Sequence, residues 1–145
     1  HIIGLGVDQN IPAGMPATET TQAISELGGV VIIAHPYDLL RRGIGRYINL
    51  ELLRFDAIES LNAGIITPLA NYFAQRVARR HGWTMVAGSD AHIPEVVGRA
   101  YTVVEVHTRT VEGVLEAIRH GRCTPCGRRT TLIQKLKTVI AARLG

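Results

Sequence analysis

Residues of the types that bind divalent metals recur at related positions in this sequence. His35 directly follows an apolar, strand-like run, the pair Asp90 and His92 follows another, and Glu59 lies within a third. Asp90 and His92 are two residues apart, so in an extended segment both side chains would point to the same side. Imidazole together with carboxylate suits Zn²⁺, Mn²⁺ or Fe²⁺ better than Ca²⁺ or Mg²⁺ alone. A single histidine after a strand is more often a hydrogen-bonded structural residue, so the joint placement is what indicates a metal site. His1 could join it only if the fold brings that end of the chain to the others.

The elements that must position these residues alternate along the chain. Glycine pairs, proline and threonine caps, and β-branched runs mark their ends. Strands are predicted at 1–7, 30–34, 56–62, 84–87 and 100–106, and helices at 18–27, 50–54, 67–81, 110–120 and from 131 onward, after a turn around Pro125 and Gly127. This alternation predicts an α/β architecture with a largely parallel sheet, whose sites lie at the carboxyl ends of the strands.

Apolar stripes predict which side of each helix faces the core. The helix after Thr67 has the stripe Leu69, Phe73 and Val77. The helix after Thr110 has the stripe Val111, Val114, Leu115 and Ile118, and the last helix has Leu132, Ile133, Leu136, Val139 and Ile140.

Composition restricts the class of protein. Of 145 residues, 46% are apolar and 19% charged, which suits one globular domain and excludes general disorder. The longest aliphatic run, 30–34, is far too short for a membrane span. The opening lacks a signal-peptide pattern and two cysteines are too few for a disulfide scaffold, so a cytoplasmic location is expected. The chain does not begin with methionine, and it reads as a piece of something longer.

The net charge of +4 is concentrated at the carboxyl end. Residues 119–145 hold seven basic and no acidic side chains, and the other 118 residues hold nine basic and twelve acidic ones. Such a segment could contact nucleic acid, but no aromatic residue is interleaved for base stacking, which favours a solvated basic helix. Cys123 and Cys126 form a C-x-x-C pair, but it lacks the context of a redox motif or a four-thiolate zinc site.

Three segments in order resemble the later motifs of the PHP family, named for polymerase and histidinol phosphatase. They are GGVVIIAHP at 28–36, DAIESLN at 56–62 and AGSDAH at 87–92, followed by Gly98. The opening HIIGLGVD is similar to the histidine-bearing strand that precedes AHP in the family. The resemblance covers most of positions 1–107. It implies a metal-dependent phosphoesterase on a distorted (β/α)7 TIM-like barrel, with two or three divalent ions, Zn, Mn or Fe, in its mouth.

The resemblance also implies roles for individual residues. His1 and His35 would bind one metal, Asp90 a second and His92 a third, with Asp90 and His92 as the catalytic pair. Glu59 matches a frequent family glutamate that would face the substrate or support the ligands. Phosphate-binding candidates, chosen on loop position alone and each more often a surface arginine, are Arg41, Arg42 and Arg99.

The family's first signature, an HxH pair and further ligands, has no counterpart in this chain. A whole (β/α) barrel takes about 250 residues, so residues 1–127 are expected to be the carboxyl-terminal portion of the domain. Residues 128–145 are expected to form a basic amphipathic helix packed on it. The expected activity of the complete domain is hydrolysis of a phosphomonoester, a nucleotide or an oligonucleotide 5′ phosphate by metal-activated water. The isolated chain, lacking the amino-terminal half, is expected to show little activity. The alternative is a catalytically inactive PHP-like module that serves as a scaffold or contacts nucleic acid.

Overall fold

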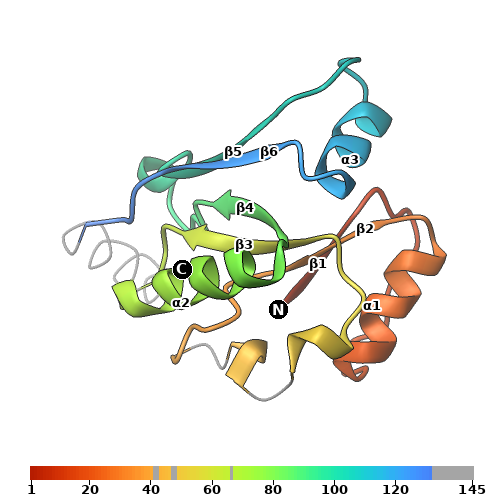
Figure 1. The fold of residues 1–145 in the computed structure, drawn as a ribbon, viewed down its shortest axis with the longest axis horizontal. Helices are drawn as coiled ribbons and strands as arrows, with labels where there is room; N and C mark the ends of the chain where they lie inside the picture. The colour runs from red at the N-terminus through yellow and green to blue at the C-terminus, as the bar shows by residue number, and fades with distance from the viewer. Residues whose placement is uncertain (41–42, 47–48, 66, 132–145) are drawn as a thin grey trace.

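A four-stranded sheet in the order β1-β2-β3-β4 forms the centre of the computed structural model, which describes residues 1–40, 43–46, 49–65 and 67–131 (Figure 1). Strands β2, β3 and β4 run parallel, while β1 pairs antiparallel with β2. The strands are β1 (Ile2–Leu5), β2 (Val30–Ile33), β3 (Ala57–Asn62) and β4 (Thr84–Gly88). The predicted mostly parallel α/β sheet is therefore confirmed, with β1 as the exception.

A second, two-stranded antiparallel sheet is formed by β5 (Ala100–Val104) and β6 (Cys123–Gly127). We call it the β5–β6 ribbon. The sequence predicted a turn around Pro125 and Gly127, and this prediction was wrong. Five consecutive residue pairs with β5 hold the segment extended, and Pro125 is tolerated because β6 is an edge strand.

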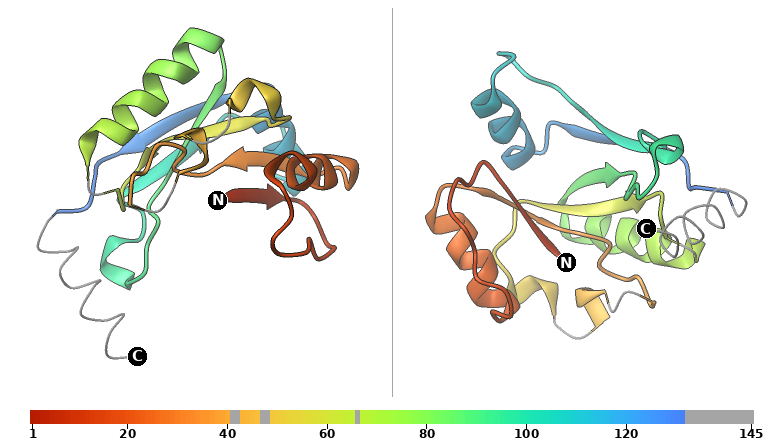
Figure 2. Two further views of the ribbon diagram at one scale, coloured as in Figure 1. Left: turned by 90° about the horizontal axis from the view of Figure 1, so that it is seen from below. Right: turned by 180° about the vertical axis from the view of Figure 1, so that it is seen from behind.

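Helices cover both faces of the main sheet. The helices are α1 (Ala17–Glu26), α2 (Pro68–His81) and α3 (Val111–Arg119), with short 3₁₀ turns at Ile44–Arg46, Leu50–Leu52 and Pro94–Val96. Val31 and Ile33 of β2 pack in one apolar cluster with residues of α1 and α2. Val30 and Ile32 pack in another with Ile118 of α3. Figure 2 shows α2 lying across its face of the sheet. The strand β2 is thus buried on both faces, as its β-branched run predicts.

Local signals set the ends of two helices as expected. Pro68 is the first residue of α2, after Thr67 in an extended conformation, and Gly82 ends the helix in the left-handed conformation. The Thr110 hydroxyl accepts a hydrogen bond from the Gly113 N–H at the start of α3.

The predicted core-facing stripe of α2 was wrong. Leu69 and Phe73 are 60% and 48% exposed, and Val77 is half-buried. The side facing the sheet consists instead of small residues and one amide, Ala70, Asn71, Ala74 and Ala78. Small side chains let the helix lie close to the strands, and this closeness allows polar side chains of α2 to reach the backbone of β3.

The stripe of α3 is confirmed in part. Ile118 is buried and Leu115 is half-buried against the sheet, but Val111 and Val114 are exposed. Gly113 and Ala117 occupy the buried side with Ile118. The segment 132–145, which holds nearly all of the predicted last helix, and the pair Arg41 and Arg42 lie outside the described residues. Within the described part of the chain, none of the helices has the length and apolar character that a membrane span requires.

Candidate metal centre

His1 and His35 meet at the edge of the sheet where the parallel strands end. The antiparallel pairing of β1 brings the start of that strand beside the end of β2, so the end of β1 that carries His1 reaches the other residues. His1 Nδ1 lies 2.8 Å from His35 Nε2, and the two rings pack edge to face. His35 is 4% exposed. In this pair one ring donates and the other accepts, and the tautomers of the two rings decide which is which.

Glu59 lies behind the histidine pair, on β3. Its side chain is buried, and Oε2 accepts a hydrogen bond of 2.7 Å from the His35 N–H. Gly88 of β4 leaves room for the carboxylate, because a Cβ there would lie 2.6 Å from Glu59 Oε1. The position of Glu59 thus suits a residue that supports the ligands.

Asn62 links Glu59 to Asp90. Its Nδ2 donates to Glu59 Oε2 at 3.0 Å and to Asp90 Oδ2 at 3.2 Å. Asn62 is 1% exposed. A hydrogen-bonded path therefore runs from the His35 backbone through Glu59 and Asn62 to Asp90. The sequence reasoning missed Asn62, although a polar residue at the carboxyl end of a buried strand is a signal that could have identified it.

His92 is less well placed than the other residues. Its side chain is 56% exposed, and Nδ1 lies 2.9 Å from the Asp90 carbonyl oxygen and 3.9 Å from Asp90 Oδ1. Within the described ranges, no group of three His, Cys, Asp or Glu side chains converges as a metal site requires. The structure instead brings these side chains together as two pairs, His1 with His35 and Asp90 beside His92.

Two residues of this edge have an unusual backbone conformation. His35 has φ of 29° and Asp90 has φ of 50°, and among the described residues they alone have positive φ without being glycine. Such a conformation costs on the order of 1–3 kcal/mol for each residue, and it concentrates at functional sites. His35 follows β2 and Asp90 follows β4, so both lie at the same edge of the sheet.

Arg99 directly precedes β5, and the two cysteines lie on β6. Arg99 Nη2 contacts the Arg129 carbonyl oxygen at 3.5 Å, which is a structural contact beside the β5–β6 ribbon. Cys123 and Cys126 are free thiols three residues apart on β6, so their side chains leave opposite faces of the strand. Burial raises the pKa of the Cys123 thiol, and Arg122 opposes this to a smaller extent.

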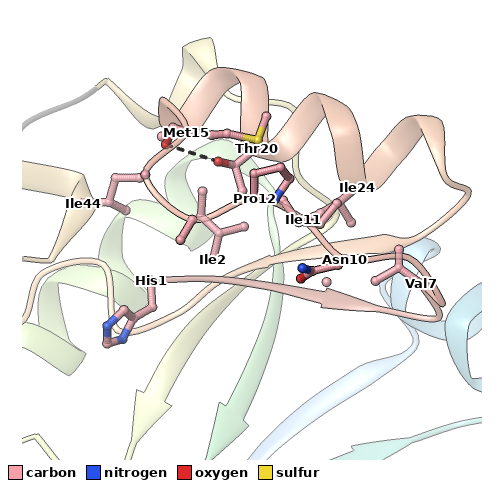
Figure 3. Close-up of a pocket in the computed structure, with 14 residues that line it drawn as sticks. His1, Ile2, Val7, Asn10, Ile11, Pro12, Met15, Thr20, Ile24 and Ile44 are labelled. Atoms are coloured by element: carbon pink, nitrogen blue, oxygen red, sulfur yellow. Dashed lines mark hydrogen bonds between the residues drawn. The ribbon is translucent and has the colours of Figure 1, made fainter.

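A cavity of about 750 Å³ adjoins His1. It lies between β1, the loop 8–16 and α1, with His1 at one end and Val7 at the other (Figure 3). Most of the side chains that line it are apolar, but His1, Asn10 and Thr20 and the backbone give it a mixed surface. Its size is that of a small-molecule pocket.

Comparison with known families supports the resemblance seen in the motifs. Residues 68–123, from the start of α2 to the start of β6, match the PHP-associated family, PHP_C. Two uncharacterised proteins of Methanocaldococcus jannaschii are similar in sequence. MJ0417 is 32% identical over 106 residues, which are 70% of this chain and 45% of that protein. MJ1587 is 38% identical over 75 residues, which are 48% of this chain and 42% of that protein.

A solved structure shares the fold. It is a two-domain protein from Bacteroides vulgatus ATCC 8482, described as containing a predicted PHP-like metal-dependent phosphoesterase. The TM-score is 0.65 at 16% identity, over 97% of this chain and 45% of that one. The chain spans somewhat less than half the length of these relatives. The family match and the shared fold confirm the resemblance to PHP proteins.

Proposed function

We propose that this chain is the carboxyl-terminal part of a PHP-type metal-dependent phosphoesterase that hydrolyses a phosphomonoester, a nucleotide or an oligonucleotide 5′ phosphate. The observation that carries the proposal is the buried path from His35 through Glu59 and Asn62 to Asp90. A buried carboxylate and two non-glycine residues with positive φ each lower the stability of the fold. Folding alone does not require them at this edge of the sheet. They are expected where a metal site needs fixed ligands.

The residues present suit part of a divalent metal site. With the proton between them released to solvent, the facing nitrogens of His1 and His35 would hold one ion, while Asp90 and His92 would contribute to a second and third. An ion bound there supplies positive charge for the phosphoryl oxygens and lowers the pKa of a bound water. Glu59 orients His35 through the backbone N–H of that residue, and Asn62 orients Asp90. Ligands from outside this chain would complete each shell, so the isolated chain is expected to bind metal weakly.

We also propose that the sheet is part of a (β/α)7 barrel. A second cavity, of about 250 Å³, lies against the main sheet and β5. Side chains from all five strands line it, among them Ile3, Ile32, Glu59, Val86 and Val104. Residues two apart on β5, Thr102 and Val104, share this lining, as expected of one strand face. In a closed barrel this cavity would be interior, with Glu59 at its carboxyl end.

Metal analysis of the full-length protein tests the proposal. We expect about two to three equivalents of Mn, Fe or Zn in the parent protein, hydrolysis of p-nitrophenyl phosphate, and loss of at least one equivalent in Asp90→Ala. Glu105→Ala, at an exposed acidic residue just beyond β5, is the matched control and should retain the metal. A full-length protein without bound metal that binds RNA in a salt-sensitive manner would support the inactive module instead.

A further inference from the structure

The carboxyl end of β3 contains a β-bulge that sets the direction of two side chains in the candidate centre. Glu59 and Leu61 of β3 face Val86 and Ala87, which are consecutive on β4, so Ser60 is an extra residue. In a regular strand, residues 59 and 62 would point to opposite faces of the sheet. The extra residue reverses this alternation, and the hydrogen bond between Asn62 and Glu59 shows that both side chains meet on one side.

Two amide side chains of α2 hold this bulge. The Asn71 carboxamide accepts from the Asn62 N–H at 3.1 Å and donates to the Asn62 carbonyl oxygen at 3.0 Å. It therefore replaces a neighbouring strand as the hydrogen-bond partner of the Asn62 backbone on that side. One helical turn later, Gln75 Nε2 donates to the Ser60 carbonyl oxygen at 3.3 Å. Bulges leave backbone groups of the strand ladder unpaired, and these contacts satisfy them.

Asn71 differs from Gln75 in what it controls. Both Asn62 and Asn71 are buried, at 1% and 5% exposed, and the two hydrogen bonds of Asn71 fix both ends of the Asn62 residue. Asn62 in turn contacts the carboxylates of Glu59 and Asp90 through a single nitrogen. Among the described residues, the Gln75 side chain forms a hydrogen bond only with the extra residue, Ser60.

We propose that Asn71 is a positioning residue of the metal centre. It holds the Asn62 backbone so that the Asn62 amide keeps Glu59 and Asp90 in their binding orientation. This inference rests on the proposed function, because it assigns Asn71 a role in a site that binds metal. It also explains why an amide occupies the alanine-rich buried side of α2.

The test is a Mn²⁺ titration of the full-length protein by calorimetry, with the thermal midpoint measured in parallel. We expect Asn71→Ala to weaken Mn²⁺ binding about tenfold, as substitutions behind metal ligands do. Gln75→Ala, the matched control on the same helix face, should bind Mn²⁺ within about twofold of the parent, even if its midpoint falls as far. Asn71→Asp, which keeps the size and one oxygen acceptor but loses the donor, should also weaken binding and serves if the alanine variant does not fold.

Two results would overturn the inference. One is parent-like Mn²⁺ affinity in folded Asn71→Ala or Asn71→Asp, and the other is an equal loss of affinity in Gln75→Ala, which would show a general stabilising role. A parent protein that binds no divalent ion is a different result, since it contradicts the proposed function itself.

Discussion

The carboxyl edge of the parallel strands β2, β3 and β4 and the β5–β6 ribbon both carry residues of metal-binding types, but only the parallel edge brings them together. At that edge each strand ends on the same side, so His35 and Asn62 lie near each other although 27 positions separate them. On the ribbon, Cys123 and Cys126 lie on one strand and leave it on opposite faces. Closeness in sequence is therefore a poorer guide to a site than a shared strand end.

The two regions also differ in where they place left-handed backbone. Around the ribbon the residues with positive φ are glycines, Gly98, Gly121 and Gly127, for which this conformation carries little strain. At the parallel edge two such positions are His35 and Asp90, whose side chains the site would use. The ribbon thus has little backbone strain, whereas the parallel edge has strained backbone at two residues whose side chains belong to the candidate site.

The largest expected effect is on the ribbon. Gly127→Ala should destabilise the protein by about 3 kcal/mol, because φ is 107° and a Cβ would lie 2.3 Å from the Arg99 carbonyl oxygen. Urea unfolding measures this change. Gly98→Ala is the control, since its φ is also positive but nothing lies within 4 Å of the added Cβ, and it should lose only about 1 kcal/mol. Equal losses in the two variants would mean that close approach to Arg99 is unimportant.

Next in size is a substitution at the parallel edge. Glu59→Ala should lower the free energy of unfolding by about 2 kcal/mol, because the His35 N–H and the Asn62 amide would both lose a buried acceptor. Unlike Gly127→Ala, it should also weaken Mn²⁺ binding by the full-length protein. Glu59→Gln keeps an oxygen for the His35 N–H and should lose less stability. Parent-like metal binding in Glu59→Ala would mean that the parallel edge, like the ribbon, contributes stability and no metal site.

The junction between the two regions is expected to contribute less. The Thr102 hydroxyl accepts from the Ala87 N–H and donates to the Ala87 carbonyl oxygen, both at 2.9 Å, and so joins β5 to β4. Thr102→Val keeps the shape and removes both bonds, which should cost about 1 kcal/mol in chemical unfolding. Thr124→Val, at an exposed position of β6, should be neutral. No change in Thr102→Val would mean that the ribbon is held by packing alone.

The smallest effect concerns the thiol of Cys123. Its pKa is raised by burial, so less thiolate is present at pH 8 than in an ordinary thiol. In a Cys126→Ala variant, we expect iodoacetamide to react with Cys123 more slowly than with the urea-unfolded chain, and the rate to keep rising at a pH where the unfolded chain has levelled off. Faster reaction of the folded protein at pH 7 would instead indicate an activated thiol, and would support a redox role for the C-x-x-C pair.

Much of the fold could be predicted from local signals. The β-branched run 30–34 after two glycines predicted the strand β2, which is buried on both faces. Pro68, Gly82 and Thr110 predicted ends of helices, because each acts on backbone groups within a few residues of itself. The motifs that contain His35, Asn62 and His92 predicted that these segments meet, since parallel strands end at one edge.

Contacts between distant segments decided the rest. The direction of β1, which brings His1 to His35, depends on its pairing with β2, and the strand β6 exists because it pairs with β5. The buried side of α2 was decided by how closely that helix lies on β3, a property that its apolar stripe does not encode. The sequence by itself determined most of the strands and helices, β6 excepted, and which residue types could bind metal. Only the tertiary structure decided which side chains meet, because a bulge at Ser60 and the hydrogen bonds of Asn71 turn Asn62 toward Glu59 and Asp90.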